Sequence, residues 1–149
     1  MSPAPKASAT PRRRVPIADG IAAVQTLRAQ LNTAATDPAD MFTGLPRQVT
    51  ATAVRYLLEE LAARAPGNAV EIRVPPFGVT QAVAGPRHTR GTPPNVVEMT
   101  PAVFLAVALG LVPAEDIWDS ITASGIRADL RQLFPLVNPA HPDPVRRED

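Results

Sequence analysis

The chain contains no cysteine, so disulfide bonds, thiolate metal ligands and cysteine nucleophiles are all excluded. Aromatic residues make up only 4% of the 149 residues, so a hydrophobic core has to be built mainly from Leu, Val, Ile and Ala. No apolar run reaches the length of about 18 residues that a membrane-spanning helix needs. The basic N-terminus is not followed by an apolar stretch, so no secretory signal is predicted. From these absences we expect a cytoplasmic protein.

The groups used most often in catalysis are also scarce. There are two histidines, His88 and His141, and no serine stands in a nucleophile-elbow context. No carboxylate pair has the spacing of metal ligands, and no glycine motif that cradles phosphate is present. We therefore expect a protein that is not an enzyme, with no catalytic residues, no metal and no cofactor. One alternative stays open, an enzyme that uses His88 as acid or base.

Charge is distributed unevenly along the chain. The net charge is +1, but residues 1–14 carry four basic and no acidic side chains. The stretch 15–137 carries nine arginines against eleven acidic residues. A slightly acidic central part argues against a domain that binds specific nucleic acid sequences.

Proline content marks the ends of the chain. Residues 1–16 are rich in proline and basic residues, and residues 138–149 are again rich in proline. Such segments cannot bury enough apolar surface to become ordered. We predict a disordered basic tail over 1–16, one folded domain over 17–137 and a disordered C-terminal tail over 138–149.

Hydrophobic periodicity predicts the elements of this domain. Helical spacing predicts helices over 18–35 and 50–65, the second capped by Thr50. Alternation predicts strands over 70–74 and 77–83, the second with Phe77, Val79 and Val83 on one face that Gln81 shares, and a third strand over 96–99. A Thr100-Pro101 pair starts a helix over 100–109. A short helix from 113, a strand over 121–123 and a last helix over 126–136 follow. Grouped strands flanked by helices indicate an α+β domain of two layers.

The polar loop, residues 85–95, is the least regular part of this pattern. It contains two arginines, a histidine, two threonines and an asparagine, and no large apolar side chain. A loop of this length inside a compact domain is often functional. Its arginines can bind an anion through their guanidinium forks. They can equally pair with Glu71 or Glu98 of the same domain.

Residues 54–137 resemble the sterol carrier protein type-2 superfamily. The closest likeness is to its small bacterial branch, found mainly in actinobacteria. The run 70–78, the polar loop 85–95 and the following residues 96–98 carry most of this resemblance. It implies a curved, mainly antiparallel sheet of four to five strands covered by helices. It also implies a non-catalytic module with an apolar cavity for a fatty acid, acyl-CoA, sterol or other lipid.

On this basis we predict the residues of the site. Those expected to line the cavity are Leu57, Leu61, Phe77, Val79, Val97, Phe104, Leu130 and Phe134. Those expected at the cavity mouth, against a polar head group, are Arg87, His88, Thr89, Arg90, Thr92 and Asn95. A second interpretation stays open: a regulatory domain with a filled core that docks an unidentified protein partner through the polar loop.

Overall fold

The computed structural model describes residues 13–85 and 95–137. In order, these residues form α1 (Ile17–Gln30), α2 (Pro38–Met41), α3 (Arg47–Arg64), β1 (Val70–Val74), β2 (Gly78–Ala82), β3 (Val96–Glu98), α4 (Pro101–Ala108), α5 (Ala114–Ile117) and β4 (Thr122–Ser124). Short 3-10 turns occupy Trp118–Ser120 and Arg131–Leu133. The predicted α+β class is confirmed.

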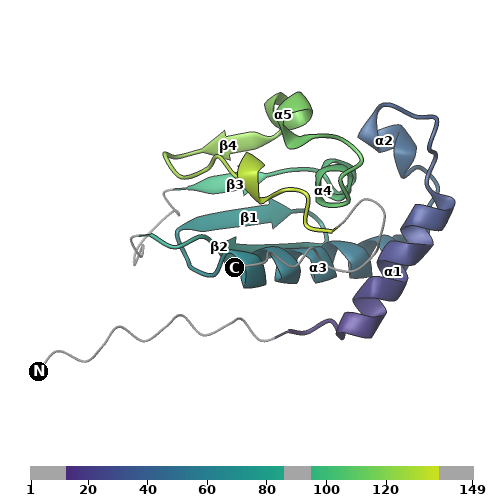
Figure 1. Cartoon of the computed structure of the whole chain (residues 1–149), viewed down its shortest axis with the longest axis horizontal. Helices are drawn as coiled ribbons and strands as arrows, with labels where there is room; N and C mark the ends of the chain where they lie inside the picture. Colours follow the sequence, from purple (N-terminus) through teal and green to yellow (C-terminus); the bar gives the residue numbers. More distant parts are fainter. Residues whose placement is uncertain (1–12, 86–94, 138–149) are drawn as a thin grey trace, which may run out of the picture.

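The four strands of the described residues form one mixed sheet in the order β2-β1-β3-β4. The outer pairs β1–β2 and β3–β4 are antiparallel, and the central pair β1–β3 is parallel. Parallel pairing places the start of β1 and the start of β3 at the same end of the sheet. Strand β2 finishes at this end, and the chain enters β3 there through Asn95. In Figure 1, α3 lies along β2, and α1 packs against α3 at the right-hand end of the molecule.

One face of the sheet is buried against the helices. Val70, Ile72 and Val74 of β1 are fully buried, together with Val97 of β3. The intervening Glu71 and Arg73 are only partly buried and form an ion pair of 2.7 Å on the opposite face. The alternation predicted for β1 is therefore confirmed.

Helices α1 and α3 approach each other very closely. A Cβ atom added to Gly20 would lie 2.2 Å from the ring of Tyr56. Gly20 of α1 thus lets the fully buried Tyr56 of α3 pack directly on the α1 backbone. At the far end of α3, Gly67 has φ +147°, and the carbonyl of Val83 would lie 2.2 Å from an added Cβ. Only glycine fits this turn.

Helix boundaries follow the predictions unevenly. Thr100 caps α4 by accepting a hydrogen bond of 3.2 Å from the amide of Val103, and Pro101 is at the first turn. Helix α3, however, begins at Arg47 after Pro46, so the predicted cap at Thr50 is wrong. Pro46 directly precedes the helix, and its fixed φ suits this position. Thr50 lies inside the helix instead of before it. Helix α1 ends at Gln30, before the predicted end at 35.

The face assigned to β2 is also wrong. Val79 is 57% exposed, whereas Ala82 is fully buried. The register pairs Val79 with Arg73 and Gln81 with Glu71, which puts both on the open face of the sheet. Val83 leaves the strand with φ 71°, so the predicted common face of Phe77, Val79 and Val83 does not exist.

The predicted last helix is wrong as well. Residues 125–137 form a turn, a 3-10 turn and an irregular segment, and Ile126 is 97% exposed. The segment is held by other partners: the amides of Leu136 and Val137 donate to the carbonyl of Ala108 at 2.9 and 3.2 Å. Arg64 donates to the carbonyls of Pro135 and Leu136 at 2.8 Å each. Leu130, Leu136 and Val137 are thus buried without a helix.

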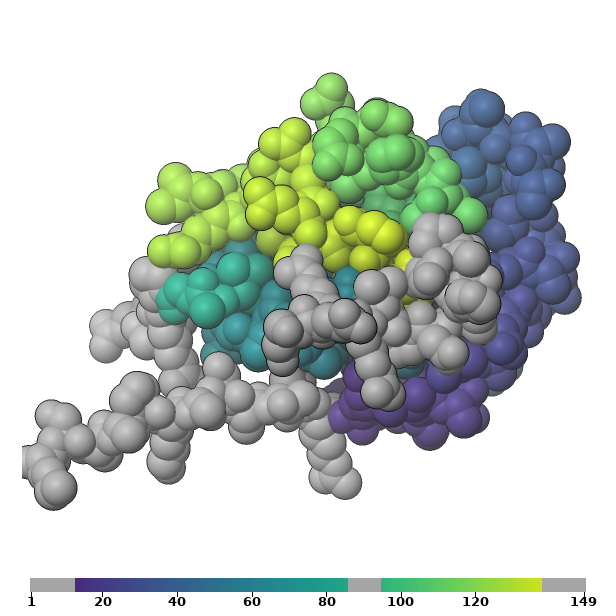
Figure 2. All heavy atoms as spheres, in the orientation of Figure 1, coloured from purple at the N-terminus to yellow at the C-terminus, as the bar shows by residue number. Residues whose placement is uncertain are grey.

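Two further observations concern the ends of this segment. In Figure 2 the yellow residues near the end of the described chain lie beside the green region that contains α4 and α5. In the 3-10 turn, the hydrogen bonds that Arg131 donates lower the pKa of the Asp129 carboxyl.

Among the described residues, no helix has the length and apolarity needed to cross a bilayer.

Candidate functional site

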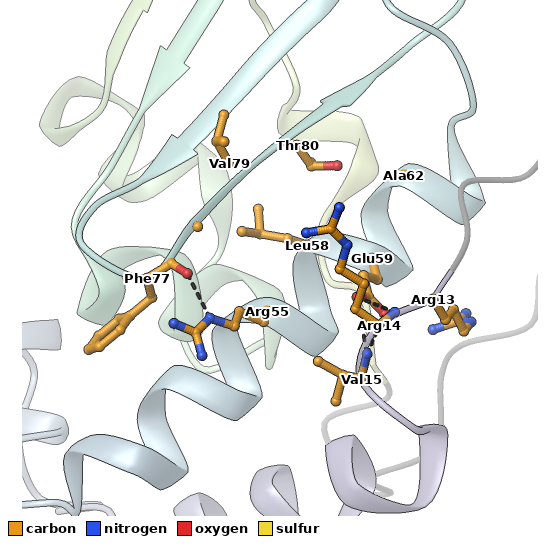
Figure 3. A pocket seen from close by; sticks show the side chains of 11 residues that line it. Arg13, Arg14, Val15, Arg55, Leu58, Glu59, Ala62, Phe77, Val79 and Thr80 are labelled. Carbon is orange, nitrogen blue, oxygen red and sulfur yellow. Dashed lines mark hydrogen bonds between the residues drawn. The ribbon is translucent and has the colours of Figure 1, made fainter.

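An open groove lies between helix α3 and strand β2. We call it the α3–β2 groove; its volume is about 1090 Å³. Its apolar wall is formed by Val15, Leu58, Ala62, Phe77 and Val79, and its polar wall by Arg13, Arg14, Arg55, Glu59 and Thr80, with Gly78 between them. Figure 3 shows these side chains around the groove.

The N-terminal segment, residues 13–15, forms one side of this groove because α3 holds it in place. The Glu59 carboxylate accepts hydrogen bonds from the amide of Arg14 at 2.9 Å and from the amide of Val15 at 3.2 Å. Arg13 forms an ion pair with Glu60, whose side chain is nearly buried. Val15 packs against the core. Two adjacent carboxylates on α3 therefore position the segment.

The opposite end of the groove is held by arginines of α3. Arg55 Nε donates to the carbonyl of Phe77 at 2.9 Å. The guanidinium of Arg47 lies over the Phe77 ring at 5.3 Å from its centroid, a favourable cation–π contact. The backbone comes close here, since a Cβ added to Gly78 would lie 3.0 Å from Leu58 Cδ1. Phe77 thus has a defined position at the groove edge.

The groove carries more positive than negative groups. Arg13, Arg14 and Arg55 line it together with one carboxylate, Glu59, and Arg13 is paired with Glu60. Within the described part of the chain, the Arg14 side chain has no hydrogen-bond partner. Figure 3 shows it reaching into the groove beside Leu58, toward β2. A cationic group above an apolar wall can bind an amphipathic molecule.

The described residues offer little for covalent chemistry in this groove. They include no group of three His, Cys, Asp or Glu side chains that could hold a metal ion. Among the described residues that line the groove, Thr80 is the one with a hydroxyl group; both histidines, His88 and His141, lie outside the described residues. The arrangement can bind and orient a molecule.

The predicted cavity-lining residues fall into two groups. Phe77 and Val79 line the α3–β2 groove. The other six lie in the hydrophobic core or against it: Leu57, Leu61, Val97, Phe104 and Leu130 are buried, and Phe134 is partly buried. Phe134 packs edge-to-face on Phe104 with ring centroids 6.3 Å apart. In the described residues these six side chains pack on one another and on their neighbours.

The predicted head-group residues are placed only in part. Arg87, His88, Thr89, Arg90 and Thr92 lie outside the described residues. Asn95 is buried, and its Nδ2 donates to the carbonyl of Ala69 at 2.9 Å. Its Oδ1 accepts a bond of 2.9 Å from the amide of Arg127. These bonds use both ends of its amide to join β1, β3 and the turn after β4.

Sequence reasoning missed the residues that form the polar wall of the groove. Arg13 and Arg14 fall in the segment predicted as a disordered tail. One signal was available: Val15 and Ile17 are apolar directly after the arginines. A second was the Glu59-Glu60 pair, because consecutive residues of a helix lie about 100° apart and the two carboxylates therefore reach toward different neighbours. Neither signal by itself indicates the partner.

Comparison with known proteins identifies a family for residues 46–136. A family model described as bacterial SCP ortholog, where SCP stands for sterol carrier protein, matches residues 46–136. The match begins directly before α3 and includes the whole sheet. No curated protein matches the chain.

Proposed function

The chain belongs to the family of bacterial SCP orthologs, and on this premise we propose that it is a non-catalytic module that binds a hydrophobic molecule. The class of ligand is a fatty acid, an acyl-CoA, a sterol-like compound or another lipid. We propose further that it does so in the cytoplasm, without a metal or cofactor and without specific nucleic acid.

The observation that carries the proposal is the apolar wall of the α3–β2 groove. Ligand pockets of proteins typically measure about 300–1,000 Å³, and the groove has about 1090 Å³. Leu58, Phe77 and Val79 line it from two different elements. Each methylene of a chain that becomes buried there contributes about 0.8 kcal/mol, so a chain of ten carbons is enough for useful affinity.

We propose that the predicted residues act at two depths. Phe77 and Val79 contact the ligand in the groove, and Leu57, Leu61, Val97, Phe104, Leu130 and Phe134 support it from within. Leu57 and Leu61 are on the same helix as Leu58, so a ligand that enters more deeply has to move α3 away from the sheet. The polar loop, with Arg87, His88, Thr89, Arg90 and Thr92, stays a proposed second contact.

Replacing Val79 tests the groove. Val79→Asp places a charge on an exposed side chain that lines the groove, so it should lower the affinity for 1-dodecanol about tenfold while the fold is kept. Titration calorimetry of the full chain with 1-dodecanol measures this.

Gln81→Asp is the matched control, because Gln81 lies on the same face of β2 and does not line the groove. It should leave the affinity within about twofold. Equal losses in the two variants, or none in Val79→Asp, would contradict a site in this groove.

The buried core also supports a second candidate function. A protein-interaction domain with a filled core would dock its partner through the polar loop and bind no lipid. It predicts that 1-dodecanol, dodecanoate and cholesterol all fail to bind or to raise the melting temperature. Binding of any of them at one molecule per chain excludes it as the main function.

A further inference from the structure

We propose that the ligand of the α3–β2 groove carries an anionic head group and that Arg14 binds this group. The inference rests on the proposed function, since it specifies the ligand of the same groove. It also moves the head group from the polar loop to the N-terminal segment.

The first argument is the position of Arg14. Its amide and that of Val15 are bound by Glu59, and its neighbour Arg13 is paired with Glu60. The backbone on both sides of its Cα is therefore fixed on α3. Figure 3 shows the Arg14 guanidinium pointing into the groove, next to Leu58. A side chain presented from a fixed backbone loses less entropy when it binds.

The second argument is that the nearby carboxylates are already used. Glu60 pairs with Arg13, and Glu59 accepts bonds from two backbone amides. Arg55 directs its Nε to the carbonyl of Phe77. Among the described residues, the Arg14 guanidinium is thus left with all its donors available. A guanidinium beside an apolar wall is best satisfied by a carboxylate or phosphate that arrives on the ligand.

The third argument concerns the path of the ligand's apolar chain from its head group. Arg14 and Arg55 lie on different sides of Leu58 in Figure 3. A head group bound at Arg14 therefore places an attached acyl chain over Leu58, toward Phe77 and Val79. The chemistry common to the possible ligands is a single negative group on one end of an extended apolar chain.

Three probes and three variants test the inference at pH 8, where a carboxylic acid is ionised. The probes are dodecanoate, its neutral analogue 1-dodecanol, and butyrate, which has the charge without the chain. The variants are Arg14→Ala, Arg131→Ala as a control at an exposed arginine outside the groove, and Arg87→Ala/Arg90→Ala as the test of the polar loop. Circular dichroism checks that each variant is folded.

We expect the unmodified chain to bind dodecanoate at least about tenfold more tightly than 1-dodecanol, because a hydrogen bond to a charged group is worth about one order of magnitude in affinity. Arg14→Ala should abolish this preference and leave the affinity for 1-dodecanol within about twofold. Arg131→Ala and the loop variant should keep the preference, and butyrate should bind at least about a hundredfold more weakly than dodecanoate.

The other outcomes overturn the inference in different ways. Equal affinity for dodecanoate and 1-dodecanol removes the head-group role but leaves the proposed function. Loss of the preference in the loop variant, with Arg14→Ala unchanged, moves the head group to the polar loop. Butyrate binding as tight as that of dodecanoate makes the site one for small anions. If neither long-chain probe binds the unmodified chain, the proposed function fails together with the inference.

Discussion

Asn95 illustrates how single polar residues hold this fold together. It is nearly buried, at 5% exposure, and its side chain joins the carbonyl of Ala69 to the amide of Arg127. Its own carbonyl also accepts the amide of Glu71 at 3.0 Å. If the side chain were removed, the carbonyl of Ala69 and the amide of Arg127 would lose this partner, whereas the backbone bond to Glu71 would remain. The residue is therefore better explained as a structural bridge than as a ligand contact.

Asn95→Ala should lower the free energy of unfolding by about 2–3 kcal/mol, because one buried and one part-buried backbone group lose their hydrogen bonds. Urea denaturation of the full chain measures this. Asn32→Ala is a suitable control, since the Asn32 side chain accepts only an exposed bond from Ala34. We expect a loss below about 1 kcal/mol there. Similar values for the two variants would show that Asn95 has no bridging role.

At the scale of elements, one face of α3 packs in the core and another face lines the groove. Its buried side chains Val54, Leu57 and Leu61 belong to the core. Leu58, Glu59 and Ala62 line the groove. Because α3 also lies along β2, it covers the edge of the sheet that would otherwise be exposed. The N-terminal segment then adds to α3 through Glu59 and Glu60.

Glu59→Ala should release the N-terminal segment, because the amides of Arg14 and Val15 lose their acceptor. We expect their hydrogen exchange, followed by NMR, to become at least about tenfold faster, with little change in the core amides. Glu98→Ala, which removes an exposed carboxylate of β3, should leave these two amides unchanged. Unchanged exchange of the Arg14 and Val15 amides in Glu59→Ala would contradict the proposed attachment.

The elements also show what the sequence could predict. Thr100-Pro101 and the alternation of β1 are local signals, and both were interpreted correctly. The face of β2 depends on its register with β1, which no local pattern contains. The apolar spacing of residues 126–136 suits a helix, but hydrogen bonds from Arg64 and to Ala108 hold this segment in an irregular path. Tertiary partners decide such cases.

At the scale of the whole molecule, the candidate site was harder to predict than the fold. Phe77 and Val79 were chosen as residues lining a cavity, and both line the groove. Arg14 and Glu59 are 45 residues apart in the chain, so their contact depends on how α1 folds back along α3. A sequence pattern does not contain that distance. The basic charge of the N-terminus also hides this contact, because a basic, proline-rich segment is typical of a disordered tail.

The whole molecule thus combines a well-packed core with an amphipathic groove on its surface. This arrangement differs from a closed chamber, since a ligand can bind in the groove without opening the core. Binding at the surface should also be reversible and fast, as the proposed lipid-binding role requires. The proposed function therefore depends on whether a lipid binds to the folded chain at all.

Native mass spectrometry of the full chain, purified and then incubated with dodecanoate, tests this most directly. We predict a complex of one dodecanoate per chain, or one co-purified lipid that extraction under denaturing conditions releases. The melting temperature should then rise by about 5–10 °C at a hundredfold excess over the Kd. A chain that keeps its unliganded mass with every lipid tested, at an unchanged melting temperature, would contradict the account.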